Sequence, residues 1–292
     1  MLGRALAVTC LLGLLGAGAG AQPFSGGADE RMALVIGNAG YTRAALRNPV
    51  NDARAVAATL RELGYGVIYR ENAAQGDMID AMREFALRSA NSQVRIVFYA
   101  GHGAQLKGKN YLIPVDAAFK EEEEVPLKTA NVSELIDRLG QAKDGVNIVI
   151  LDACRNTPFP LATTTRGLNP ARSLAPGLAP ISAPLGAKGT LIAYSTAPGS
   201  IALDGPGNNS AFTRHLLANM QIPGLPVEQL FKRVRIAVSE ETQQAQIPWE
   251  TSSLRGDFCF RSAANGECVI ADSTVAAAGA SGKDKQVKTG AR

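Results

Sequence analysis

His102 and Cys154 are the residues of this sequence best suited to chemistry. His102 closes an apolar run over residues 94–103, and Cys154 closes a second apolar run over residues 146–154. An imidazole can take the proton of a thiol, and the resulting thiolate is a strong nucleophile. Two such groups at the ends of two apolar strands predict a cysteine-dependent acyl-transfer site.

Gly103 adds a second component to this site. Without a Cβ atom, its backbone N–H can approach a substrate carbonyl, and together with the N–H of Cys154 it would form a two-donor oxyanion hole. Either Cys154 or His102 alone would fit a structural core residue, and their pairing at matching strand ends favours catalysis. The other histidine, His215, is flanked by apolar residues of an expected helix and is predicted to be a structural residue or a surface residue.

The pattern along the chain places both residues at one edge of a sheet. Apolar runs predict strands over residues 31–37, 66–70, 94–100, 146–151 and 189–196, with a short extended piece over 111–116. Helical periodicity predicts helices over residues 51–63, 75–90, 131–141, 210–220 and 227–240. Such alternation predicts an α/β fold with a mainly parallel central sheet and helices on both faces. Ligands bind beyond the carboxyl ends of the strands in such sheets.

The amino-terminal residues 1–21 have the features of a secretory signal peptide. Arg4 is followed by an apolar stretch, and small residues at 19 and 21 precede the expected cleavage site. An uncleaved anchor is the alternative, although the apolar run is short for a membrane span. We therefore expect a periplasmic or secreted protein with no stable membrane insertion after cleavage. A net charge of +4 without a basic stripe gives no nucleic-acid signature.

The cysteines remaining after signal cleavage fit an oxidising compartment. Cys259 and Cys268 bracket a short polar loop, so we expect a disulfide between them and a free thiol at Cys154. Three free thiols are the alternative. The sequence has no Cys-x-x-Cys or His-x-x-x-His spacing, which excludes the common zinc patterns and argues against a disulfide oxidoreductase.

Three other segments lack the strand–helix pattern. Residues 22–30 are expected to form a loose lead-in, residues 157–188 a flexible linker, and residues 271–292 a disordered tail. The acidic run over residues 121–124 is predicted to be a solvated loop or helix start, with a cation site as the alternative.

The order of several short runs makes the chain resemble the caspase-like cysteine peptidases. It is most similar to the bacterial relatives of metacaspases, which are called orthocaspases. The matching runs are Ala33–Asn38, Asn51–Ala53, Tyr99–Gly103, Leu151–Arg155 and Ala193–Gly199. The resemblance implies a caspase-like fold with a His102–Cys154 dyad. Its large-subunit-like half would span residues 31–156 and its small-subunit-like half residues 189–270, and no third orienting residue can be placed.

The same resemblance points to the specificity pocket. Where caspases carry glutamine and arginine, this chain has Asp152 and Asp204, and Asp52 matches an aspartate of metacaspases and paracaspases. Three carboxylates would attract a basic side chain and repel an acidic one. Asp52 as a helix N-terminal charge or cap and Asp204 as a turn residue are the alternatives. Arg47, near an arginine that serves aspartate specificity in caspases, is out of register when Asp52 is aligned.

These observations predict a cysteine endopeptidase that cleaves protein or peptide substrates after arginine or lysine. Self-cleavage in the 157–188 linker is expected at Arg166, Arg172 or Lys188. No cofactor or metal is expected to be required, and the resemblance leaves calcium activation open. The alternative function is a caspase-fold regulatory or binding module with little or no peptidase activity.

Overall fold

The computed structural model describes residues 30–142, 144–154, 178–184, 188–197, 202, 204–205, 207–266 and 268. The predicted signal peptide, nearly all of the lead-in, the tail, Arg166 and Arg172 lie outside these residues. Among the helices described, none is long and apolar enough to cross a membrane.

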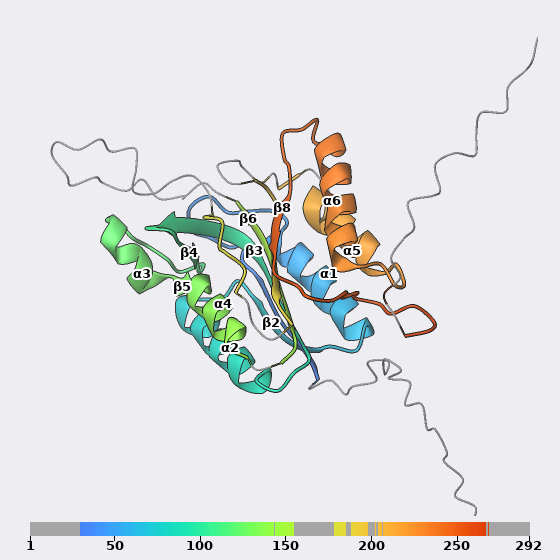
Figure 1. Ribbon diagram of the computed structural model, residues 1–292. Coiled ribbons are helices and arrows are strands. Elements are labelled where there is room, and N and C mark those ends of the chain that lie inside the picture. The colour runs from blue at the N-terminus through green and yellow to red at the C-terminus, as the bar shows by residue number, and fades with distance from the viewer. Residues whose placement is uncertain are drawn as a thin grey trace, which may run out of the picture.

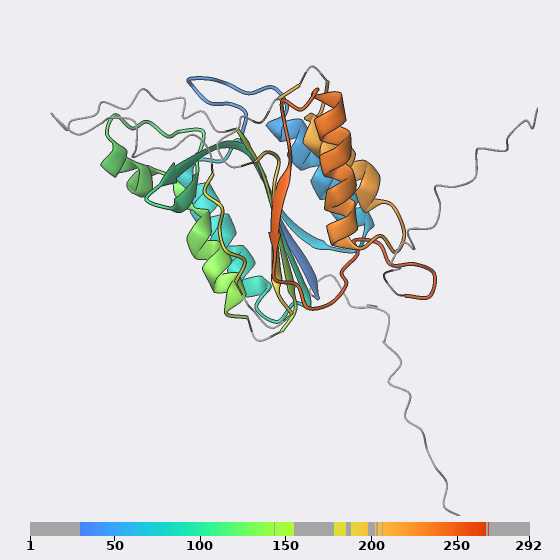
Figure 2. The same ribbon diagram turned by 45° about the horizontal axis from the view of Figure 1, so that its top comes forward.

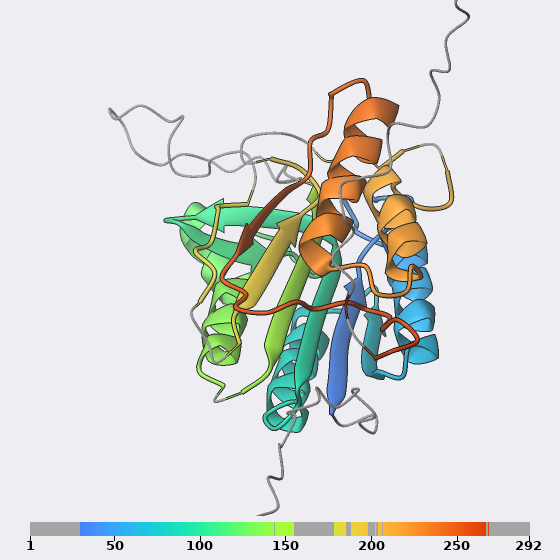
Figure 3. The same cartoon turned by 45° about the vertical axis from the view of Figure 1, so that its right-hand side comes forward.

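A mostly parallel sheet forms the centre of the molecule (Figure 3). The strands are β1 (Arg31–Gly37), β2 (Gly66–Glu71), β3 (Val94–Leu106), β4 (Lys109–Leu112), β5 (Ala130–Asn131), β6 (Val146–Cys154), β7 (Thr190–Tyr194) and β8 (Trp249–Ser252). The main order is β2-β1-β3-β6-β7-β8, in which only β8 runs antiparallel to its neighbour. The predicted α/β class with a mainly parallel sheet is confirmed.

Helices cover both faces of this sheet (Figures 1 and 2). They are α1 (Pro49–Glu62), α2 (Gln75–Arg88), α3 (Val125–Lys128), α4 (Val132–Gly140), α5 (Ala211–Met220) and α6 (Val227–Glu241), with a short 3₁₀ helix, η1 (Glu122–Glu124). Helices α1, α5 and α6 pack on one face, and α2 and α4 pack on the other.

Strand β1 shows why its sequence is apolar throughout. Ala33 and Val35 point into the core under α1, α5 and α6, whereas Met32, Leu34 and Ile36 point into the core under α2 and α4. A parallel strand buried on both faces has a continuous apolar sequence because alternate side chains enter different cores. The same property made the central strands recognisable from sequence.

Strand β3 is longer than the expected 94–100 segment and continues through His102 to Leu106. It pairs with β6 as far as His102, and from Gly103 onward it pairs with β4 in an antiparallel ladder. A third small core of apolar side chains lies under this extension. His102 therefore lies inside a strand that changes partners, rather than after the end of a strand.

The carboxyl-terminal part of the expected flexible linker is packed in the structure. Leu178 and Ala179 are buried, and Ala179 exchanges two hydrogen bonds with the side chain of Asn110, of 2.6 and 2.9 Å. The hydroxyl of Tyr194 on β7 contacts both Ala179 and Ile181. Residues 178–184 are thus attached to the sheet, and residues 157–177 and 185–187 of the expected linker lie outside the described residues.

The carboxyl-terminal region contains the expected disulfide partners. The structure joins Cys259 and Cys268, with Cα atoms 5.6 Å apart. This pairing leaves neither of them available as a second nucleophile beside Cys154.

Candidate active site

His102 and Cys154 are directly opposite one another on neighbouring strands. They form the last paired positions of the β3–β6 ladder; β6 ends at Cys154, whereas β3 continues to Leu106 beside β4. The main chain therefore brings together two residues that are far apart in the sequence. This edge is where α/β sheets place their reactive groups.

The imidazole of His102 is held by a backbone carbonyl. Its Nε2 lies 2.7 Å from the oxygen of Ala44, and because a carbonyl can only accept, Nε2 must carry the proton. Nδ1 is buried and has no hydrogen-bond partner among the described residues. Burial lowers the pKa of His102, although the Ala44 hydrogen bond and Asp204 oppose this effect. A neutral imidazole with its lone pair on Nδ1 is suited to accept a thiol proton.

Ala44, whose carbonyl holds the imidazole of His102, has an unusual backbone conformation. Its φ is +53°, in the left-handed region that residues with a Cβ atom rarely adopt. The strained residue is the one whose carbonyl orients His102. Strain of this kind is commonly found at functional sites, where the surrounding structure maintains it.

Two tyrosines fix the main chain of the histidine. The Tyr41 hydroxyl accepts from the His102 N–H at 2.9 Å, and the Tyr99 hydroxyl donates to the His102 carbonyl at 2.6 Å. A Cβ atom on Gly101 would lie 2.6 Å from one of these hydroxyls and 2.7 Å from the other. Glycine before His102 is therefore required by the tyrosine pair.

Leu178 and Ala153 lie close to the position that a Cβ atom would take on Gly103. A Cβ atom there would lie 2.9 Å from Leu178 and 3.3 Å from Ala153. A larger residue at 103 would displace the packed segment 178–184 or the strand that carries Cys154. Glycine at this position keeps the predicted oxyanion-hole segment close to Cys154.

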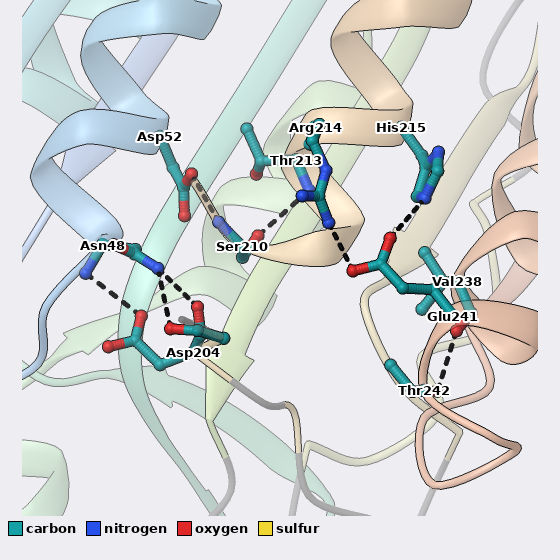
Figure 4. Close-up of polar contacts among 11 residues, drawn as sticks. Asn48, Asp52, Asp204, Ser210, Thr213, Arg214, His215, Val238, Glu241 and Thr242 are labelled. Atoms are coloured by element: carbon teal, nitrogen blue, oxygen red, sulfur yellow. Dashed lines mark hydrogen bonds and ion pairs between the residues drawn. The ribbon is translucent and has the colours of Figure 1, made fainter. Parts of the chain in front are cut away.

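Asp52 lies in the first turn of α1 and is almost completely buried. Its Oδ1 accepts from the Asn209 side chain at 2.8 Å and from the Ser210 N–H at 3.0 Å (Figure 4). Burial, followed by the charge of Asp152, raises its pKa to about 7. Asp52 therefore bonds to the start of α5 and is not a cap of its own helix.

Asp152 precedes Cys154 by two residues and is also buried. Its Oδ2 accepts from the hydroxyls of Ser210 at 2.6 Å and Thr213 at 3.0 Å. Burial raises the pKa of Asp152, against the hydrogen bonds to these hydroxyls. Ser210 thus contacts both carboxylates, one through its N–H and the other through its hydroxyl.

Asp204 lies near this pair, and its charge raises the pKa of both Asp52 and Asp152. Its carboxylate oxygens accept from the backbone N–H groups of Arg47 at 2.7 Å and Asn48 at 3.1 Å. Figure 4 shows the contact with Asn48. Asp204 therefore ties its loop to the chain just before α1. The side chain of Arg47 takes no part in this bond, and the residue is exposed.

The comparisons with known proteins agree with this geometry. The family model described as caspase domain matches residues 30–259, well over half of the chain. The chain belongs to the caspase family. The caspase domain includes β1 to β8, His102, Cys154 and the three carboxylates.

Curated relatives of this caspase domain are distant. Mucosa-associated lymphoid tissue lymphoma translocation protein 1 of Homo sapiens is 30% identical over 129 residues, which is 44% of this chain and 15% of the relative. The Mus musculus homolog matches equally, and Caspase-1 of Sus scrofa is 31% identical over 134 residues, 43% of this chain and 31% of the relative. The chain therefore spans well under half the length of these relatives. It is a caspase-family cysteine peptidase domain.

Several residues of this caspase domain were not found by sequence reasoning. They are Ala44, which contributes only its carbonyl, and Tyr41, Asn209, Ser210 and Thr213, which contact the site residues. Ser210 did carry a signal, because it is a helix N-cap whose hydroxyl accepts from the Thr213 N–H. The carbonyl of Ala44 carried none, since every residue has one.

The raised pKa of Asp52 predicts a pH-dependent stability. Between its ordinary value of 3.8 and about 7, the folded state binds more protons than the unfolded state, so stability falls as pH rises through this window. The Asp52→Asn variant should unfold at a higher temperature than wild type at pH 8, because its amide oxygen can keep both hydrogen bonds without a buried charge. Each kcal/mol gained in the free energy of unfolding raises the unfolding temperature by about 2–4 °C for a domain of this size.

Thermal unfolding followed by circular dichroism at pH 4 and pH 8 measures this effect. The difference between Asp52→Asn and wild type should shrink toward pH 4, because Asp52 is then protonated in the folded state and the unfolded-state carboxyl is close to its ordinary pKa of 3.8. A variant that unfolds at a lower temperature at pH 8 would contradict the expected cost of this buried carboxylate.

Proposed function

We propose that the protein is a cysteine endopeptidase that cleaves after arginine or lysine, using His102 and Cys154. The observation that carries the proposal is the cluster of Asp52, Asp152 and Asp204 beside the dyad, whose charges act on one another. None of the three forms an ion pair with a lysine or arginine of the described residues. Asp52 and Asp152 are buried and Asp204 is partly buried, and a group of carboxylates of this kind without a counter-cation is suited to a cationic ligand.

The catalytic sequence follows from the roles of the two dyad residues. Nδ1 of His102 takes the thiol proton of Cys154, and the thiolate attacks the carbonyl carbon of the bond to be cleaved. The oxyanion accepts hydrogen bonds from the N–H groups of Gly103 and Cys154, and His102 returns its proton to the leaving amine. Water then hydrolyses the acyl-enzyme. The Ala44 carbonyl keeps the imidazole oriented and stabilises its protonated form throughout.

The carboxylate cluster selects the residue before the cleaved bond. An arginine guanidinium can form two parallel hydrogen bonds with a carboxylate, which favours arginine over lysine. An aspartate in the same place would bring a further negative charge to carboxylates that already repel one another. The cluster therefore favours basic residues and disfavours acidic ones.

Fluorogenic peptides that differ only in the last residue before the leaving group test this function. The arginyl peptide should be cleaved fastest, the lysyl peptide more slowly and the aspartyl peptide not measurably. Citrulline is a neutral isostere of arginine. The ratio of kcat/KM for the arginyl peptide to kcat/KM for the citrullyl peptide should increase as pH rises toward about 7, because Asp52 ionises in this range. Faster turnover of the aspartyl peptide would refute the proposal.

Self-cleavage is proposed at Arg166 or Arg172, and not at Lys188. Lys188 precedes β7 at the amino end of the sheet, where it forms an ion pair with Asp144 at 3.4 Å. Thr190 pairs with Asn147, seven residues before Cys154, so Lys188 is roughly 20 Å or more from the nucleophile along the strand. The packed segment 178–184 lies between Lys188 and the earlier basic residues.

We also propose a periplasmic or secreted location and no requirement for calcium or another cofactor. The disulfide fits an oxidising compartment. In the acidic run, Glu124 accepts from the N–H groups of Lys120 and Glu121 and pairs with Lys128 at 2.7 Å. Glu124 thus stabilises the start of its helix, which supports the structural interpretation of the run.

A further inference from the structure

A cavity of about 510 Å³ lies beside the catalytic histidine, on the side of α3 and β4. Its walls come from two segments, residues 41–43 after β1 and residues 115–120 after β4, together with two side chains of the η1–α3 region. Tyr41 and Phe119 provide apolar wall, and Arg43, Lys120 and Lys128 provide basic groups. The proposed function assigns no role to this cavity.

Tyr41 connects the cavity to the catalytic histidine. Its ring lies 4.4 Å from that of His102, measured between centroids, and the same side chain lines the cavity. The carboxylate cluster lies at the amino ends of α1 and α5, whereas α3 and β4 lie on the opposite side of the sheet (Figures 1 and 2). The cavity and the carboxylate cluster are therefore on opposite sides of His102.

This arrangement identifies the part of a substrate that reaches the cavity. With a basic side chain bound by the carboxylates, the chain after the cleaved bond must pass His102, which gives a proton to the leaving amine. An extended chain advances about 3.3–3.6 Å per residue, so the cavity is within reach of the first two residues after the cleaved bond.

The charges in the cavity favour an acidic side chain. Lys128 is already bound by Glu124 and by the carbonyl of Ala118. Arg43 and Lys120 are exposed, and neither forms an ion pair with any residue that the structure describes. Asp116, the other carboxylate in the wall, accepts the N–H of Gln75. The wall thus carries three cations against two carboxylates, and Arg43 and Lys120 are the cations that remain available to a ligand.

We propose that this cavity binds an acidic side chain of the leaving peptide segment, at the first or second residue after the cleaved bond. The inference rests on the proposed peptidase function and extends it to the other side of the cleaved bond. The substrate would then carry a basic residue before the bond and an acidic residue just after it, so that its charges match two oppositely charged sites.

Internally quenched peptides with one arginine and a single varied position test the proposal. The second residue after arginine is glutamate, glutamine or lysine. We expect kcat/KM in the order glutamate, glutamine, lysine, with glutamate favoured over glutamine by about 3-fold or more, as exposed charge pairs give. The preference should decrease in 0.5 M NaCl, because salt screens exposed charges. A glutamate to glutamine ratio near 1 in the wild-type protein would overturn the proposal.

Variants of the two cations locate the preference. In Lys120→Gln and Arg43→Gln, the glutamate to glutamine ratio should fall toward 1. Lys232→Gln removes an exposed lysine from α6, on the other side of the sheet, and should keep the wild-type ratio. A glutamate preference that survives in both cavity variants would place its origin elsewhere and overturn the proposal. Testing both variants separates loss of the charge from disturbance of Ala44 next to Arg43.

An arginyl aminocoumarin, which has no residue after arginine, tests the peptidase function itself. If this substrate is hydrolysed but the quenched peptides show no acidic preference, the inference fails and the peptidase function stands. If no arginyl substrate is hydrolysed, both fail.

Discussion

Replacing His102 with glutamine should lower kcat for arginyl peptides by about 10²- to 10⁴-fold, the range typical of a lost general acid–base group. The glutamine amide can still donate to the Ala44 carbonyl, which accepts from Nε2 of His102 at 2.7 Å. It has no basic nitrogen to take the thiol proton. The loss should therefore fall on kcat, with KM little changed, because the carboxylate cluster proposed to bind arginine is intact.

The matched control is the other histidine of the chain. His215 lies on α5 and pairs with Glu241 at 2.8 Å, on the side away from Asp52 (Figure 4). His215→Gln should keep wild-type kcat. Cys154→Ala should abolish turnover, labelling by a peptidyl-arginine electrophile and cleavage of the chain at Arg166 or Arg172. Chain cleavage that persists in Cys154→Ala would show that another protease is responsible.

The central strands were predictable because burial on both faces leaves a continuous apolar sequence. Residues 31–37 were predicted with the observed bounds for this reason. Strand β8, in contrast, is an edge strand whose Trp249 and Ser252 are exposed, and its four residues contain no apolar run. It was not predicted because it is recognisable only by its pairing with β7.

The end of β3 was misjudged for a related reason. Gly101 and Gly103 are typical of a turn, and the sequence predicts a strand that stops before them. In the structure these glycines allow the strand to continue past two tyrosine hydroxyls and the packed Leu178. Both positions require glycine because other side chains lie too close for a Cβ atom, and not because the chain turns there. Only the tertiary structure shows which side chains these are.

Asp204 shows the limit of position-by-position inference. Its alignment placed it in the specificity pocket, and its charge does act on Asp52 and Asp152. Both of its oxygens, however, accept backbone N–H groups next to α1. The charge of Asp204 therefore acts on Asp52 and Asp152 while its carboxylate holds two loops together, a double role that residue type alone does not reveal.

Replacing Asp152 with asparagine should lower kcat/KM for arginyl peptides by about 100-fold, since losing one partner of a buried, hydrogen-bonded charge pair costs about 2–5 kcal/mol. The asparagine oxygen can still accept from Ser210 or Thr213, so the start of α5 should stay in place. The variant should also be no less stable than wild type at pH 8, because burial already disfavours the charged form of Asp152.

A peptide with citrulline in place of arginine shows whether Asp152→Asn removes an attraction between charges or changes the shape of the site. Citrulline keeps the length and planarity of arginine but is neutral, so its cleavage should change little in Asp152→Asn, and the arginine to citrulline ratio should collapse. Asp144→Asn, which removes an exposed carboxylate at the amino end of β6, should keep the wild-type ratio. If Asp152→Asn retained the full arginine preference, Asp52 and Asp204 would be sufficient to select the basic residue. Asp152 would then serve only to anchor Ser210 and Thr213 beside the nucleophile.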